Sequence, residues 1–328
     1  MSNLLRDPAG PDAAPATTVP GSAADGAAIE VLTAREVPLG GTRKLRVRRT
    51  LPHRSLRTVG AWCFVDHYGP VPLAQEGMDV PPHPHVGLQT VTWLLEGEVL
   101  HQDSLGSEQV IAPGQLNLMT AGHGIAHAET SVPRPGGHLH GVQLWVALPD
   151  ASRHQPAHFE HHADLPAWSG PGVEATVLMG ELDGVRSPAA TYTPLLGTEL
   201  SLHGVAAVPL EPDFEHAVLA LDGTVDVDGM LVQPGSLAHL GRGRRSLRLH
   251  ADRPGRALLL GGEPFGEELL MWWNFVGRTH EDIARAREDW ATGRRFGRVV
   301  GYSGEALLAP PLPSTRLRPR PSGSGRIA

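Results

Sequence analysis

The chain has 328 residues with 28 basic and 35 acidic side chains, which gives a formal net charge of −7. This balance provides no basic field, so we expect no direct binding of nucleic acid. No apolar run is as long as a membrane span of about 20 residues, so we expect no membrane insertion. The single cysteine, Cys63, excludes an intramolecular disulfide, and Met1–Val19 lacks the features of a signal peptide, so we expect a cytoplasmic protein.

The predicted elements are mostly short strands. Residues 1–27 are rich in Ala, Gly and Pro without an apolar period, and we expect them to be disordered. Alternation typical of strands then recurs in Lys44–Thr50, Gln89–Leu95, Val110–Leu118, His138–Leu148, Val218–Val227 and Ser246–His250. Turns that contain glycine, such as Pro113-Gly114 and Asp222-Gly223, separate strand-like stretches. Many short strands at this spacing predict an all-β protein made of sandwiches or barrels.

A weak internal repeat indicates that two barrels share one plan. Leu94–Val99 (LLEGEV) resembles Ala220–Val225 (ALDGTV), and Ile111–Leu116 (IAPGQL) resembles Val232–Leu237 (VQPGSL). Two related β-barrels are the economical explanation. The predicted division is an N-terminal barrel at 28–150, a linker at 151–168, a C-terminal barrel at 169–308 and a disordered tail at 309–328.

One helix is predicted at residues 280–292, within the C-terminal part. Thr279 can cap its N-terminus, Asp282 stands at the capping-box position, and Gly293 can end it. Three residues recur at helical spacing on one face: Ile283, Ala286 and Trp290. That stripe predicts that the helix packs one face on the barrels.

Two pairs of candidate metal ligands carry the chemistry. His83 and His85 are two residues apart, as are His127 and Glu129, and on a strand this spacing points both side chains to one face. The prolines around the first pair favour an extended backbone. Two such strands side by side would bring three imidazoles and one carboxylate together. This set suits a divalent transition metal with open coordination positions.

Histidine is the outlier of the composition, with twelve of the 18 histidines between His67 and His162. A second pair, His138 and His140, has the same spacing but no nearby carboxylate in a matching phase. We assign that pair to the barrel rim or to the surroundings of the ligands. From the residues alone, the alternative for the two pairs of candidate ligands is that they too are ordinary polar side chains at barrel rims.

The segments around these pairs resemble the pirin family of bicupins. The resemblance rests on VDHYGP at Val65–Pro70, HPHVGLQTVTWLLEGEV at His83–Val99, HQDSLGS at His101–Ser107 and MTAGHGIAHAE at Met119–Glu129. It continues in Gln143-Leu144-Trp145 and Asn274-Phe275-Val276. The resemblance implies two cupin barrels, each a jelly roll, with a short C-terminal helix and one mononuclear metal, usually Fe(II), in the N-terminal barrel.

The family's ligands carry over onto His83, His85, His127 and Glu129, with Fe(II) as the implied ion and Mn, Ni, Zn or Cu as alternatives. The general cupin motif has a glutamate where this chain has Gln89, so Gln89 is not expected to be a ligand. Candidates for orienting the ligands or the substrate are Gln89, His101, Asp103 and His123. A turn position for Asp103 and a surface position for His123 are equally consistent with the sequence.

The resemblance implies a dioxygenase similar to quercetin dioxygenase, with a flavonol-like or other enolic phenolic substrate, dioxygen, and Glu129 as the acceptor of the substrate proton. The alternative is a redox-responsive, metal-binding regulatory protein that acts through a protein partner without turnover. We expect a monomer in either case. The second barrel has Pro209, Glu211, Arg248 and His250 where the repeat aligns the ligands, so we expect no metal there.

Overall fold

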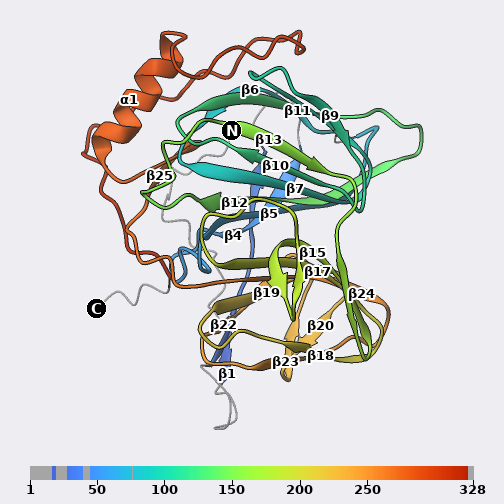
Figure 1. Cartoon of the computed structure of the whole chain (residues 1–328). Helices are drawn as coiled ribbons and strands as arrows, with labels where there is room; N and C mark the ends of the chain where they lie inside the picture. Colours follow the sequence, from blue (N-terminus) through green and yellow to red (C-terminus); the bar gives the residue numbers. More distant parts are fainter. Residues whose placement is uncertain (1–16, 20–27, 40–44, 76, 324–328) are drawn as a thin grey trace.

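The computed structural model describes residues 17–19, 28–39, 45–75 and 77–323, which form two β-barrels and one helix. Figure 1 shows one barrel above the other, with α1 (His280–Ala291) beside the upper, N-terminal barrel. No helix in these ranges is both long and apolar enough to span a membrane.

Each barrel is built from one large and one small antiparallel sheet. The large sheet of the first barrel has the order β13 (His158–His162), β10 (Leu116–Thr120), β7 (Leu88–Glu96), β12 (His138–Ala147), β5 (Trp62–Pro72), β4 (Arg46–Leu51) and β3 (Arg35–Pro38). Its small sheet has the order β6 (Asp79–His85), β11 (Ile125–Ser131), β8 (Val99–Asp103) and β9 (Glu108–Ile111).

The second barrel repeats this order. Its large sheet runs β1 (Thr17–Val19), β2 (Ile29–Leu32), β22 (Leu237–Gly241), β19 (Glu215–Asp222), β24 (Gly255–Gly262), β17 (Leu195–Leu202), β15 (Val173–Leu182) and β14 (Ala167–Gly170), with β16 (Val185–Arg186) beside β15. Its small sheet runs β18 (Val205–Pro209), β23 (Ser246–His250), β20 (Val225–Val227) and β21 (Met230–Val232). A hairpin of β25 (Leu270–Trp272) and β26 (Phe275–Gly277) precedes the helix.

The repeat found in the sequence is therefore a repeat of topology. Strands β6, β11, β8 and β9 correspond in order to β18, β23, β20 and β21. Two predicted strands, Val110–Leu118 and Val218–Val227, are each divided into two, because the turns at Gly114 and Gly223 interrupt them. Both glycines have positive φ angles, of 83° and 75°, which side chains with a Cβ rarely adopt.

The alignment of ligand positions in the second barrel needs correction. Strands β18 and β23 alternate between buried and exposed residues, and neither Pro209 nor Arg248 faces the interior. The inward-facing residues are Ala206, Val208, Leu247 and Leu249. These apolar side chains pair across the two strands, Ala206 with Leu249 and Val208 with Leu247.

Strand pairings cross the predicted domain limits at both ends of the first barrel. Strand β2, at the start of the predicted N-terminal barrel, pairs with β22 of the second barrel. Residues 17–19 were expected to be disordered, but they form β1 and pair with β2; the rest of 1–27 lies outside the described residues. The predicted linker contains β13, which extends the large sheet of the first barrel through its pairing with β10.

The helix begins as predicted and ends one residue earlier, at Ala291, and it packs on the first barrel. Thr279 accepts a hydrogen bond from the Asp282 amide, and Asp282 completes the capping box. Ile283 and Ala286 are buried with Val86, Ala126 and Ala128 of the first barrel. Burial of this apolar stripe fixes the helix against the strands that carry His85 and His127.

The predicted tail at 309–328 is an ordered segment as far as residue 323. Leu312 and Leu317 pack on the helix cluster, and Arg320 forms an antiparallel bridge with Leu269. The Gly323 amide donates to Thr58 Oγ1 at 2.8 Å. The composition of this segment resembles that of disordered chains, but backbone hydrogen bonds and apolar anchors hold it in place. Residues 324–328 lie outside the described part.

A continuous apolar core joins the barrels. Trp62, Val91 and Trp93 of the first barrel are buried with Leu178 and Leu258 of the second. The indole nitrogen of Trp62 also donates to the carbonyls of Leu196 and Gly261 at 3.1 and 3.2 Å. The two large sheets therefore pack face to face, while the interior of each barrel lies on the other side of its large sheet.

Candidate metal centre

Three histidines converge inside the first barrel from two neighbouring strands. His83 and His85 lie on β6, and His127 lies on β11 directly opposite His83. One nitrogen from each of the three rings lies within 4.8 Å of the others. The ring centroids of His83 and His127 are 4.4 Å apart. The i, i+2 spacing in β6 therefore places both of its imidazoles on one face, as the sequence predicts.

The hydrogen bonds of the three rings select the nitrogen that faces the pocket. Nδ1 of His83 donates to the Pro81 carbonyl at 2.9 Å, and Nδ1 of His85 donates to the Asn274 carbonyl at 3.1 Å. Each ring thereby keeps its Nε2 lone pair for another partner. His127 Nε2 is buried and has no hydrogen-bond partner, which is the condition expected of a ligand atom before it binds a metal.

Burial keeps these rings neutral. Desolvation lowers the pKa of His83 to about 4 and holds the pKa values of His85 and His127 well below their usual range. A neutral imidazole is the form that ligates a metal, so the site is ready for a cation near neutral pH.

His101 and Asp103 support His127 from behind. His127 Nδ1 lies 3.4 Å from His101 Nδ1, and His101 Nε2 lies 3.2 Å from Asp103 Oδ2. If His127 and His101 each donate along this chain, His127 Nε2 is left free for the pocket. The His101 ring also stacks on Phe159 with centroids 4.3 Å apart, which fixes its orientation. Asp103 Oδ1 also accepts hydrogen bonds from the amides of Leu105 and Ser107, which is the turn position that the sequence left open for this residue.

Glu129 lines the same pocket but does not join the group of three histidines within 4.8 Å. Its Oε1 accepts a hydrogen bond from Thr92 Oγ1 at 3.2 Å. Burial raises the pKa of its carboxyl group. A carboxylate with a raised pKa beside an open pocket suits the exchange of a proton with a ligand.

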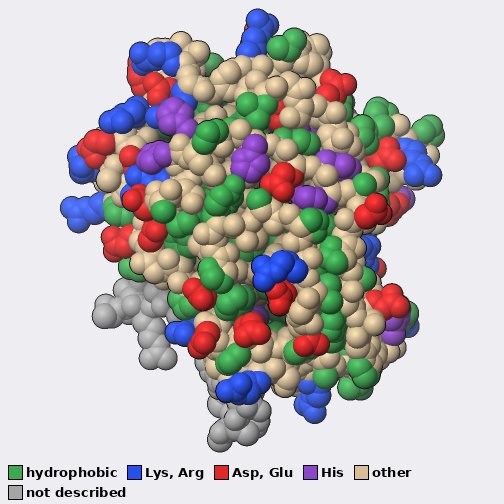
Figure 2. Space-filling view, in the orientation of Figure 1, with side chains coloured by type: hydrophobic (Ala, Val, Ile, Leu, Met, Phe, Trp, Pro, Cys, Tyr) green, Lys and Arg blue, Asp and Glu red, His purple; other side chains and the backbone are tan. Residues whose placement is uncertain are grey.

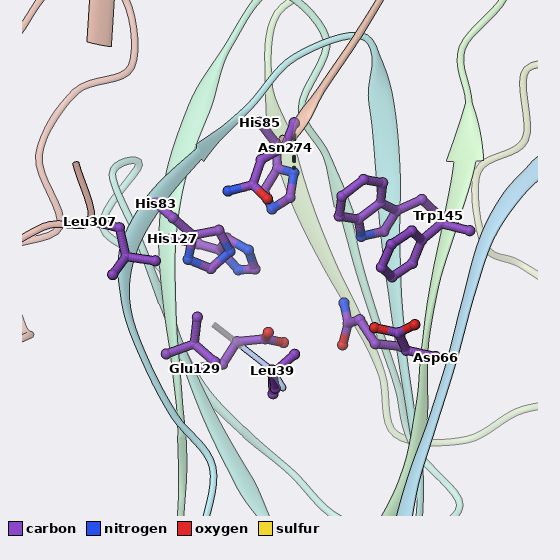
Figure 3. A pocket seen from close by; sticks show the side chains of 12 residues that line it. Leu39, Asp66, His83, His85, His127, Glu129, Trp145, Asn274 and Leu307 are labelled. Atoms are coloured by element: carbon purple, nitrogen blue, oxygen red, sulfur yellow. Dashed lines mark hydrogen bonds between the residues drawn. The ribbon is translucent and has the colours of Figure 1, made fainter. Parts of the chain in front are cut away.

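The opposite wall of the pocket belongs to the large sheet. Phe64 and Trp145 stack with centroids 4.0 Å apart, and Trp145 meets His85 edge-on. Asp66 lies beside them and is held by Arg49 in a buried ion pair, with both N–O distances at 2.7 Å. Figure 3 shows Trp145 and Asp66 facing the imidazoles across the pocket.

Two predicted site residues lie elsewhere. Gln89 does not line the pocket; its side chain donates to Thr120 Oγ1 and to the Ala190 carbonyl of the second barrel at 3.0 and 3.1 Å. His123 is exposed and lines a separate cleft. Neither residue lines the pocket that contains the three histidines.

The second His-x-His pair also lies away from the site. His140 Nε2 is 2.8 Å from His67 Nε2, and His138 is half-buried near Glu96. Figure 2 shows histidine side chains over the surface of the first barrel, so the clustering of this residue in the sequence extends beyond the ligands.

The sequence analysis missed several residues that shape the pocket. Thr92 holds Glu129, and Gln143 lies 3.0 Å from Thr92. Period-two alternation would have found both, because Thr92 is in phase with the inward side of β7 and Gln143 with Trp145 of β12. Leu307 also lines the pocket, and no motif of the sequence marks it.

The donor set fits a divalent transition metal. One nitrogen from each of three neutral imidazoles lies within 4.8 Å of the others, His127 Nε2 is buried without a partner, and a carboxylate lies in the same cavity. Fold and site together define a bicupin with a candidate metal centre in its first barrel. The comparisons with known proteins agree: Pirin matches residues 44–146, and Pirin C-terminal cupin domain matches residues 196–297. The chain belongs to the pirin family.

Known relatives cover most of the chain. A Pseudomonas aeruginosa protein provisionally named quercetin 2,3-dioxygenase is 49% identical over 289 residues, covering 87% of this chain and 91% of the relative. Human pirin is 31% identical over 260 residues, covering 76% and 87%. The crystal structure of a quercetin 2,3-dioxygenase from Acinetobacter baumannii superposes with a TM-score of 0.84 at 44% identity, covering 89% of this chain and 97% of that one.

Proposed function

We propose that this protein is a mononuclear Fe(II) dioxygenase that acts on a flavonol or another aromatic enol. The observation that carries the proposal is the pairing of three imidazole nitrogens on one wall with an aromatic stack on the other. The names of the Pseudomonas and Acinetobacter relatives support this substrate class.

Each group of the pocket has a role in this reaction. His83, His85 and His127 would hold the ion through Nε2. When bound, Fe(II) supplies a Lewis acid for an enolate oxygen and a redox centre for dioxygen. Phe64 and Trp145 would bind the flat face of the substrate and exclude water.

Glu129 is the proposed proton acceptor and a proposed fourth ligand. Its carboxylate lies in the cavity with the imidazoles, so it can take the enol proton of a bound substrate at one oxygen. The Thr92 hydroxyl donates to Oε1 and orients the carboxylate. The raised pKa makes Glu129 a stronger base than a carboxylate in water.

Oxygen uptake tests the proposal. The Fe(II)-loaded protein should consume dioxygen in the presence of quercetin, and Glu129→Gln, which keeps the shape of the side chain, should lower kcat by about 100- to 10,000-fold. Metal content of both proteins is the control, because an unchanged kcat in a metal-loaded variant would exclude Glu129 as the base. If the Fe(II)-loaded protein consumes no oxygen with any of several flavonols, the proposed dioxygenase activity is excluded. Partner binding that differs between Fe(II), Fe(III) and metal-free protein would then favour the regulatory alternative.

A further inference from the structure

The segment that follows the helix reaches the metal centre. Residues 298–312, here termed the C-terminal strap, run from the end of the helix across the first barrel (Figure 1). The match to the Pirin C-terminal cupin domain ends at residue 297, so the strap lies outside both matched ranges. Val299, Leu307 and Leu312 pack on the cluster formed by the helix and the first barrel.

Hydrogen bonds on both sides fix the backbone of Leu307. Its amide donates to the Pro82 carbonyl at 2.8 Å, and its carbonyl accepts from Trp290 Nε1 at 2.7 Å. Pro82 directly precedes His83, so the strap is bonded to the strand that carries two of the ligands. Tyr302 reinforces this position by donating to Asp79 Oδ1 on the same strand at 2.7 Å.

The side chain of Leu307 forms part of the pocket wall. It lies beside His83 and across the pocket from Trp145 (Figure 3). Leu39 and Val80 are the other aliphatic lining residues, and Leu307 packs in a cluster with both. The neighbouring Leu308 is 86% exposed and does not line the pocket. The strap therefore presents one of two adjacent leucines to the site.

We propose that Leu307 is a specificity-determining residue that contacts the aromatic body of the substrate. This inference rests on the proposed function. A planar ligand whose oxygen atoms face the imidazoles must place the rest of its ring system between the aromatic wall and the aliphatic wall. Contact with Leu307 then favours ligands that extend an aryl ring beyond the chelating oxygens, because that ring buries apolar surface against the strap.

Two probes with the same chelating edge isolate this contact. Quercetin and maltol share a 3-hydroxy-4-pyranone, but only quercetin carries aryl rings. Binding of each to the Zn(II)-loaded protein is measured by calorimetry, which requires no turnover. Leu307→Ala should weaken quercetin binding by about 5- to 20-fold and leave maltol binding within about twofold. The matched control Leu308→Ala should change neither affinity.

The outcomes separate the inference from the proposed function. Unchanged quercetin affinity in a folded, zinc-loaded Leu307→Ala protein overturns the role of Leu307, even if the wild type oxidises quercetin. An equal loss for maltol and quercetin also overturns it, because the effect would then be on the metal centre. If the wild type binds neither probe, the proposed substrate class fails and the inference fails with it. Leu307→Val, a smaller truncation, should show a weaker loss in the same direction if the alanine variant does not fold.

Discussion

The two barrels share a strand order, but their interiors are opposite in character. At the inward positions of β6 and β11, the first barrel has His83, His85, His127 and Glu129. At those of β18 and β23, the second has Ala206, Val208, Leu247 and Leu249. At these positions the second barrel packs aliphatic side chains only, although it buries a polar ring elsewhere, that of His216. The fold therefore does not require polar groups at the corresponding positions of the first barrel, where a buried polar atom without a partner costs about 1–3 kcal/mol.

The largest predicted effect is loss of metal, which a substitution in the first barrel should cause and a matched substitution in the second should not. His127→Ala should reduce bound metal from about one ion per chain to near zero, because it removes a ligand that approaches with His83 and His85. The rise in melting temperature on adding metal should disappear as well. Elemental analysis and thermal unfolding measure the two effects.

Leu247→Ala is the matched variant in the second barrel. It should cost about 2–5 kcal/mol of unfolding free energy through the cavity it leaves, but it should retain stoichiometric metal. Stoichiometric metal in His127→Ala would overturn the assignment of the site. Loss of metal from a folded Leu247→Ala protein would show that the two interiors are not independent.

The sequence predicted local features of the fold better than contacts between distant segments. Strand alternation, the repeat and the capping box of the helix are local patterns, and the structure confirms the two barrels and the helix that follow from them. Strand β2, near the N-terminus, joins the second barrel, and the C-terminal strap packs on the first. The sequence could not predict this, because the composition of either segment does not indicate which barrel it joins. Such pairings depend on edges that exist only after the sheets have formed.

The same limit explains which site residues were predicted. The spacing of the candidate ligands within two strands predicts that the three histidines point to one face, so their convergence could be predicted from the sequence. Gln89 lies away from the pocket because of its phase: it shares a face of β7 with Val91 and Trp93, which pack on the second barrel. Thr92 lies on the other face and reaches Glu129. Alternation indicates the phase, but only the packing of the two large sheets shows which face is the interior.

The second prediction concerns pH and the second barrel, where His216 is fully buried. Burial lowers its pKa to about 4, whereas the pKa of a histidine in the unfolded chain is about 6.5. Between these values the unfolded chain binds a proton that the folded chain does not, so stability is complete above about pH 6.5 and falls as the pH drops toward 4. The difference corresponds to about 3 kcal/mol for this residue.

Denaturant unfolding of metal-free protein at pH 7 and pH 5 measures this contribution. His216→Leu has a similar volume and no titrating group, so it should lose less stability than the wild type over that interval. Equal losses would show that His216 does not contribute to the acid sensitivity. Metal-free protein is used so that metal release at low pH does not contribute, and the buried histidines of the first barrel contribute equally to both proteins.

The smallest predicted effect tests the support behind the metal ligands. His101→Phe keeps an aromatic ring to stack on Phe159 but removes the acceptor for His127 Nδ1. His127 then loses the bond that orients its ring, and metal affinity should fall by about 10- to 100-fold without loss of the site. Competition with a chelator measures this change. Gln89→Met is the control, since Gln89 bonds toward the second barrel, and its metal affinity should equal that of the wild type. An unchanged affinity in His101→Phe would mean that the strands alone orient His127, and the first barrel would then position its ligands by backbone packing, as the second barrel positions its leucines.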